Sequence, residues 1–142
     1  MPLVSITRLR VRSWIYLSGF VIQTLRIAWQ AKGSEGNLAV KMLRDRRNAF
    51  WTATAWSSEN AMKTFMHANP HGPTMRKLLE WCDEAALVHW LQDDAELPTW
   101  DEAHRRIQQD GRQSKVNHPS AAQSSYQIPA PAAPLHRELR LR

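Results

Sequence analysis

Apolar and polar positions alternate at the start of the chain. From Leu3 to Val11, one set of alternate positions holds small or apolar residues. The other set includes Arg8 and Arg10 and continues to Arg12 just beyond this stretch. Side chains of a strand point alternately to its two faces, so the pattern predicts a strand whose faces differ in character.

The next patterns are those of a helix and a hairpin. A helical stripe over 13–31 is expected to be buried, with an end at Gly33; it consists of Trp14, Leu17, Val21, Leu25 and Ala28. Two apolar runs, 37–43 and 49–56, are separated by a charged turn, which favours an antiparallel hairpin. Along the second run, one face is expected to carry Phe50, Thr52, Thr54 and Trp56.

A second helical pattern and a fourth strand complete the order. Ser57 and Ser58 can cap a helix with Ala61, Met62, Phe65 and Met66 on its apolar side. Prolines at positions 70 and 73 break it, and a further helix is expected to bury Met75, Leu78, Leu79 and Cys82. With a strand over 85–91, the order is β-α-β-β-α-β, the ferredoxin-like arrangement of an α+β protein.

One face of this four-stranded sheet carries apolar residues such as Ile6, Ala53 and Val88 and needs a cover. The expected cover is the sheet of a second copy, which would make a homodimer and a dimeric α/β barrel. Arg8 would then be buried between the sheets, and an acidic partner such as Asp45 or Glu84 would be required.

The domain is expected to span 1–116 and to include an appended helix over 99–110. Thr99 and Glu102 form a capping box at the start of that helix. Residues 117–142 are rich in Pro, Ala and Ser and end in a basic stretch, which predicts a flexible basic tail that is dispensable for folding.

Charge is distributed unevenly along the chain. The net charge is +6, but residues 1–56 hold nine Lys/Arg against two Asp/Glu, 57–102 hold three against nine, and 103–142 hold seven against two. Segments of opposite charge can form complementary surfaces within a protomer or across a dimer, and they do not indicate one uniform basic face. No nucleic-acid partner is therefore expected. The single cysteine fits a reducing compartment, and 14–25 is too short to span a bilayer, so a cytoplasmic protein with no membrane association is expected.

Several stretches resemble the antibiotic biosynthesis monooxygenase-like superfamily of dimeric α/β barrels, and within it an uncharacterised bacterial branch. The likeness covers about residues 3–91 and is carried by the stretches 5–11, 50–56, 61–66 and 79–85, with a further tract at 114–119. The resemblance implies a pocket between the sheet and the helices. Some members use this pocket to oxidise aromatic polyketides without a cofactor, and others bind or degrade haem.

The haem-degrading members carry an Asn on the first strand, a Trp in the second helix and a His ten positions later. Those positions hold Thr7, Phe65 and Met75 here, so the resemblance disfavours haem degradation by that route. Haem binding remains the third-ranked hypothesis, with His71 as a candidate ligand.

His71 is the candidate catalytic residue, because it extends the expected buried stripe toward the pocket and an imidazole can accept a proton from an acidic substrate. The alternative is a structural histidine at the entry of a helix. Pro70 separates His71 from His67, so no metal site is expected. His89 is expected to lie in the barrel or dimer core. The candidate substrate-binding residues are Thr7, Thr52, Thr54, Trp56, Phe65 and Met75.

The leading hypothesis is a cofactor-independent monooxygenase acting on a small aromatic or polyene substrate. The protein would remove a proton from the substrate, and the resulting carbanion would itself reduce O₂. The alternative is a non-enzymatic protein of the same fold that binds a small apolar ligand or a partner.

Overall fold

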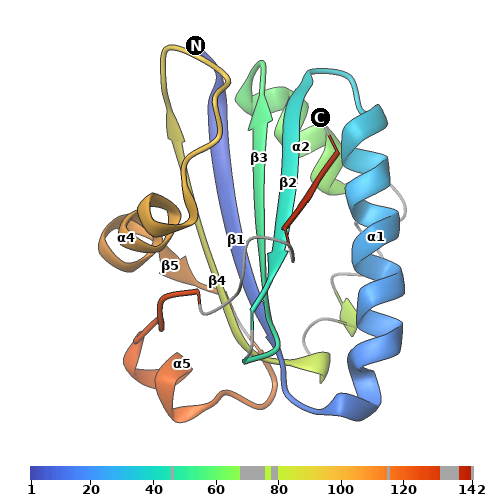
Figure 1. The fold of residues 1–142 in the computed structure, drawn as a ribbon, viewed down its shortest axis with the longest axis vertical. Coiled ribbons are helices and arrows are strands. Elements are labelled where there is room, and N and C mark those ends of the chain that lie inside the picture. Colours follow the sequence, from blue (N-terminus) through green and yellow to red (C-terminus); the bar gives the residue numbers. More distant parts are fainter. Residues whose placement is uncertain (46, 68–75, 78–79, 115, 132–137, 142) are drawn as a thin grey trace.

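In the computed structural model, the described residues are 1–45, 47–67, 76–77, 80–114, 116–131 and 138–141. They form a six-stranded antiparallel sheet in the order β5-β4-β1-β3-β2-β6 (Figure 1). The strands are β1 (Leu3–Val11), β2 (Asn37–Arg44), β3 (Ala49–Trp56), β4 (Cys82–Leu91), β5 (Arg112–Gln113) and β6 (Glu138–Arg140). The α+β class and the ferredoxin-like arrangement of β1 to β4 are confirmed.

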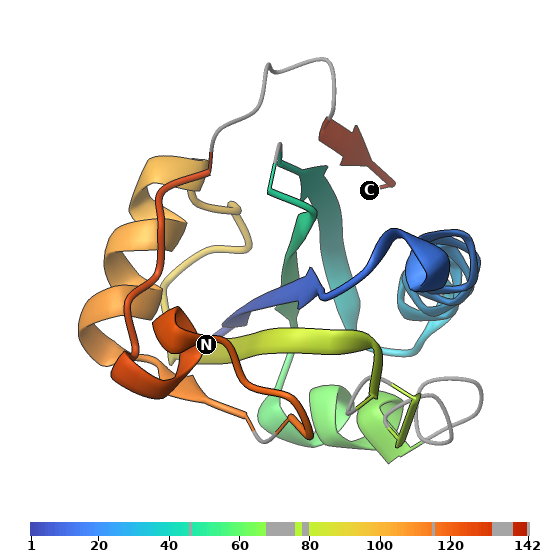
Figure 2. The same ribbon diagram turned by 90° about the horizontal axis from the view of Figure 1, so that it is seen from below.

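Helices lie on both sides of this sheet (Figure 2). The helical segments are η1 (Trp14–Tyr16), α1 (Leu17–Gly33), α2 (Glu59–His67), α4 (Trp100–Asp110) and α5 (Ala121–Ser125). Helices α1 and α2 pack on one face, in a cluster that joins Ala28 and Phe65 to Trp56. No helix in the described part of the chain has the length and apolar character that crossing a membrane requires.

The buried side of α1 differs from the stripe expected from the sequence. The residues of α1 that are buried are Phe20, Ala28 and Ala31, whereas Trp14 and Leu25 are 79% and 46% exposed. The helix is apolar around most of its circumference, so periodicity alone did not identify the side that meets the sheet.

Cys82 also differs from its expected place, because it begins β4 instead of ending a helix. It pairs with Val11 across an irregularity in the β1–β4 register and is fully buried. Burial raises the pKa of its thiol to about 12, so the thiol stays protonated and acts as a small apolar side chain.

The second face of the sheet is covered by the chain itself, so the expectation that the chain supplies no cover is wrong. Ile6, Ala53 and Val88 lie in one buried cluster with residues of α4 and with Ile128. Helix α4 presents Trp100, Ala103 and Ile107, a spacing that forms one apolar face toward the sheet. A second sheet cannot pack on this face while α4 lies there.

Arg8 lies on this same face and is 1% exposed. Its Nη1 atom donates to Oε1 of Glu84 at 2.7 Å, so the expected acidic partner is confirmed. Asp45, the other acid considered, instead accepts from Nε1 of Trp51 at 3.2 Å and caps the turn between β2 and β3.

The described part of 117–142 is packed against the domain, which differs from the expected flexible tail. The side chain of Gln123 accepts from the backbone of Ala85 and donates to the carbonyls of Ala85 and Ser114. Ile128 is buried in the core under α4, and β6 pairs with β2. A few specific amide and apolar contacts hold this segment although its composition is typical of a loop.

Truncation after His118 is therefore expected to destabilise the protein by about 2–4 kcal/mol. The estimate combines the loss of buried Ile128, at about 1.5–3 kcal/mol, with lost hydrogen bonds to β4 of about 1 kcal/mol each. For a chain of this size, thermal unfolding should show a melting temperature lower by roughly 10 °C. A variant ending at residue 131 is the control that keeps α5 and Ile128, and an unchanged melting temperature after truncation at 118 would contradict the packing described.

Candidate functional site

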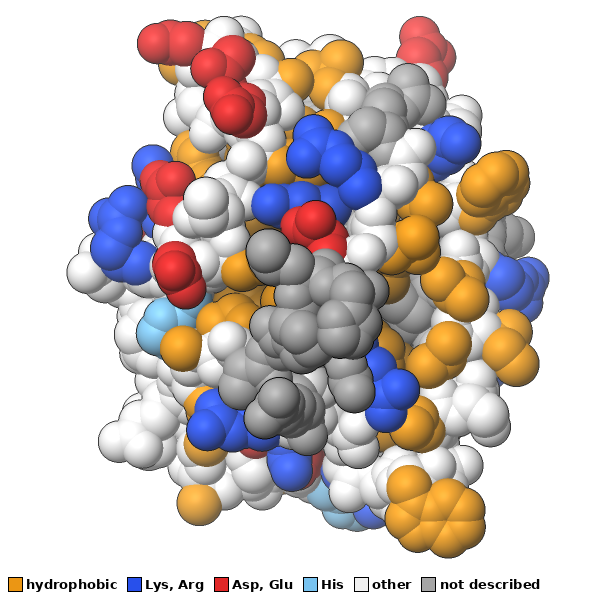
Figure 3. Space-filling view, in the orientation of Figure 1, with side chains coloured by type: hydrophobic (Ala, Val, Ile, Leu, Met, Phe, Trp, Pro, Cys, Tyr) orange, Lys and Arg blue, Asp and Glu red, His pale blue; other side chains and the backbone are white. Residues whose placement is uncertain are grey.

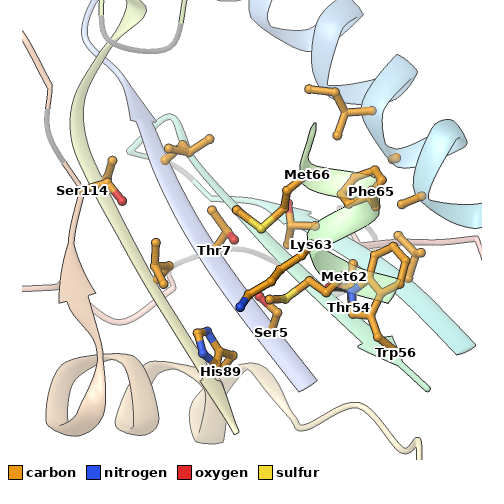
Figure 4. Close-up of a pocket in the computed structure, with 18 of the residues that line it drawn as sticks. Ser5, Thr7, Thr54, Trp56, Met62, Lys63, Phe65, Met66, His89 and Ser114 are labelled. Atoms are coloured by element: carbon orange, nitrogen blue, oxygen red, sulfur yellow. Dashed lines mark hydrogen bonds between the residues drawn. The ribbon is translucent and has the colours of Figure 1, made fainter. Parts of the chain in front are cut away.

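A cavity of about 570 Å³ lies between the sheet and helices α1 and α2 (Figure 4). Its volume lies within the usual range for small-molecule sites. The strands supply alternate residues to it, odd-numbered on β1 and even-numbered on β2 and β3, because strand side chains alternate between the two faces. On β4 the odd-numbered Ala85, Leu87 and His89 line it together with Ala86.

The register of the strands gathers four hydroxyl groups at the centre of the cavity floor. Ser5 pairs with Thr54 across β1 and β3, and Thr7 pairs with Thr52. These two pairs are neighbouring rows on the same face, so the four side chains lie next to one another. The hydroxyls can donate to or accept from a ligand oxygen.

Apolar side chains surround this polar centre. Ring contact joins Trp56 to Phe65 of α2, with centroids 5.0 Å apart, and the indole Nε1 of Trp56 donates to Thr54 Oγ1 at 2.9 Å. That bond leaves the Thr54 hydroxyl proton free to be donated to a ligand. The other apolar lining residues include Ile27, Ala28, Ala31, Val40, Met42, Met62, Met66 and Leu87.

The structure brings five of the expected substrate-binding residues together around this cavity. They are Thr7, Thr52, Thr54, Trp56 and Phe65. Their role in binding a substrate stays a prediction. The candidate base His71 and the sixth candidate, Met75, lie outside the described residues.

His89 is a cavity residue that the sequence interpretation placed wrongly. It is exposed and lines the cavity on the helix-facing side of the sheet, not the opposite face that was expected to form the barrel core (Figure 4). The register places it directly beside Ser5. The alternation along β4 could have found it, because His89 shares a face with Leu87, a neighbour of Thr7.

Further polar lining residues were not identified from the sequence, and they include Lys63, Arg112 and Ser114. Lys63 comes from α2, and Arg112 and Ser114 come from the segment after α4. No local signal placed that segment at the cavity, because its position depends on the pairing of β5 with β4.

The described lining residues do not match the haem-degrading set. Thr7 offers a hydroxyl and Phe65 a phenyl ring, and neither is a ligand for iron. The imidazoles among the described lining residues are His67 and His89, and both are exposed. Within the described residues, no group of three or more His, Cys, Asp or Glu side chains could hold a metal ion.

Comparison with known protein families shows where this chain belongs. The model of DUF3291, a domain of unknown function, matches residues 18–131, and the chain belongs to this family. The match includes α4 and α5, so the segment that covers the second face of the sheet lies within the family domain. A search of curated proteins found no significant match.

Solved structures show that the fold is that of antibiotic biosynthesis monooxygenase-like proteins. SnoaB, a cofactor-independent oxygenase from Streptomyces nogalater, aligns with a TM-score of 0.53 and 15% identity over 66% of this chain and 95% of its own. Rv0793 from Mycobacterium tuberculosis gives 0.60 and 11% over 66% and 97%. A Nitrosomonas europaea protein provisionally assigned to the antibiotic biosynthesis monooxygenases gives 0.58 and 15% over 64% and 89%.

The shares of each chain that align distinguish a core common to these proteins from an additional segment of this chain. The three structures are matched over nearly their whole length by about two thirds of this chain. The remaining third has no counterpart in them. The β1–β4 core has the size of the shared part, and α4, β5, α5 and β6 follow it.

Proposed function

We propose that this protein is a cofactor-independent monooxygenase that oxidises a small aromatic or polyene substrate in the cavity between the sheet and helices α1 and α2. The observation that carries the proposal is the cavity itself, which has apolar walls, aromatic rings at one end and four hydroxyls at the centre of its floor. SnoaB, which shares the fold, is a cofactor-independent oxygenase, and this supports the same chemistry.

The proposed reaction uses the substrate as its own reductant. A histidine accepts a proton from an acidic C–H or O–H of the substrate, and the resulting carbanion transfers an electron to O₂. Recombination forms a C–O bond, and the hydroperoxide then loses water to leave a carbonyl. For an anthrone, one oxygen atom enters the product, the other leaves as water, and the substrate CH₂ group becomes C=O.

The cavity residues would orient this substrate. The hydroxyls of Thr7 and Thr52 would donate to a substrate oxygen, and Trp56 and Phe65 would pack against the ring system. The base is proposed to be a histidine, with His71 and His89 as the two candidates.

Oxygen uptake by the purified protein tests the proposal. With anthrones and naphthols as substrates, we expect consumption of one O₂ per substrate and a product that carries one atom from ¹⁸O₂. Binding of these compounds without oxygen uptake across the panel would overturn the oxygenase proposal and support the ligand-binding alternative. A Soret band in the purified protein would support haem binding instead.

We further propose that self-association uses the outer side of α1, because α4 occupies the sheet face that a barrel dimer would need. Large apolar side chains are exposed at a spacing of seven, Ile15 in η1 at 59% and, in α1, Ile22 at 58% and Trp29 at 65%. Figure 3 shows apolar side chains exposed on the side of the molecule where α1 lies. Sedimentation equilibrium should show a dimer that Ile22→Asp dissociates and the exposed α4 substitution Gln109→Asp does not. A monomeric wild-type protein at micromolar concentration would contradict this.

A further inference from the structure

Cationic and imidazole side chains gather at one end of the cavity. Arg112 of β5 pairs with Leu87 of β4, and His89 follows Leu87 by two positions on the same face. Diagonal neighbours of this kind have Cα atoms about 7–8 Å apart, within reach of one ligand for side chains of this length. Arg112 and His89 therefore flank the same edge of the cavity floor.

Helix α2, which covers the cavity floor, contributes a second cationic group to this end. Lys63 of α2 extends from the helix toward Ser5 and His89 (Figure 4). The charges here are not all positive, because Glu59 lies 3.2 Å from the Lys63 Nζ atom. Among the described residues, by contrast, no acidic side chain forms an ion pair with Arg112.

The opposite end of the cavity carries no such charge in the described residues. Its lining comes from Trp56, Phe65, Val40 and the α1 residues Ala28 and Ala31. A ligand that satisfies both ends has an apolar ring system and an anionic group at one edge. A carboxylate matches the planar fork of an arginine.

Arg112 is itself exposed, but the backbone just before it packs tightly. A Cβ atom on the preceding Gly111 would lie 2.7 Å from the Tyr126 hydroxyl and 2.9 Å from the Leu87 carbonyl oxygen. Glycine therefore allows this backbone to approach β4 closely, and the contact brings Arg112 to the edge of the cavity. The arginine belongs to the part of the chain that follows the β1–β4 core.

We infer that the cavity binds an aromatic carboxylate, with the carboxylate at the β4–β5 edge held by Arg112 and assisted by Lys63. The inference rests on the proposed function for the identity of the site and adds the class of its substrate. His89, next to the same edge, then faces the substituents adjacent to the carboxylate.

Binding of 1-hydroxy-2-naphthoate and of its methyl ester, measured by calorimetry without oxygen, tests the inference. We expect the acid to bind the wild-type protein about tenfold more tightly than the ester, since one charge-assisted hydrogen bond is worth about that factor. Arg112→Gln should remove this preference by weakening only the acid, and Arg112→Lys should restore part of it. Arg105→Gln, on the exposed side of α4, is the matched control and should change neither affinity.

The outcomes separate this inference from the oxygenase proposal. Equal affinity for acid and ester in the wild-type protein, or an unchanged preference in Arg112→Gln, overturns the carboxylate site while oxygen uptake with neutral substrates can still be observed. A strong preference for the acid without oxygen uptake from any substrate supports the carboxylate site and overturns the oxygenase proposal.

Discussion

Replacing Glu84 by alanine is expected to lower the free energy of unfolding by about 3–5 kcal/mol, the usual cost of removing one partner of a buried ion pair. Arg8 would keep its charge in a site where 1% of the residue is exposed. Its Nε and Nη2 atoms already have no hydrogen-bond partner among the described residues, so little else can compensate. Glu84 also accepts from the Ser120 hydroxyl at 3.1 Å, and the substitution would loosen the attachment of α5.

Chemical denaturation measures this effect, with two further variants as controls. Glu102→Ala removes ion pairs to Arg105 and Arg106 on the partly exposed surface of α4 and should cost less than about 1 kcal/mol. The double variant Arg8→Met and Glu84→Leu should recover most of the stability, because a buried pair can often be replaced by apolar side chains. A loss below 1 kcal/mol in Glu84→Ala would show that water reaches Arg8.

His89→Ala is expected to lower the turnover number by about 100- to 10,000-fold, the range for loss of a general base, while KM changes little. The physical reason is position: His89 lies at the edge of the cavity beside Ser5 and can approach the acidic group of a bound substrate. Steady-state oxygen uptake gives both constants, and circular dichroism confirms that the fold is kept.

Two other histidine variants make the assignment specific. His71→Ala tests the base expected from the sequence, and a loss there together with full activity in His89→Ala would assign the base to His71. His118→Ala is the matched control, because this exposed side chain contacts Glu80 and does not line the cavity. Full activity in both His71→Ala and His89→Ala would exclude both as the base.

The position of α4 gives this chain a different way of completing the fold. An open four-stranded sheet has an apolar face that needs a cover, and a second copy is one solution. Here the cover comes from α4 and from Ile128 of the same chain. The segment after α4 then returns along β4 and brings Arg112 to the cavity on the other face. The additional third of the chain thus contributes both to stability and to the proposed binding site.

Local pattern was sufficient for the elements of the core and for much of the cavity lining. Alternation in 3–11 and 49–56 defined which residues share a face, and this placed Thr7, Thr52, Thr54 and Trp56 on one side of the sheet. The same alternation put Arg8 on the other side and required an acidic partner for it, which is Glu84. These inferences hold because strand geometry has a period of two whatever the strand packs against.

The features that depend on contacts between distant segments were decided by the tertiary structure. Trp14 and Leu25 had the right periodicity for burial, but the sheet meets a different side of α1. The segment after 117 has a loop-like composition, yet Gln123 and Ile128 find specific partners more than 15 residues away in the sequence. Arg112 and His89 come together only because β5 pairs with β4. Composition and periodicity report the preferences of each segment, whereas docking depends on the shape and hydrogen-bonding groups of the surface that another segment provides.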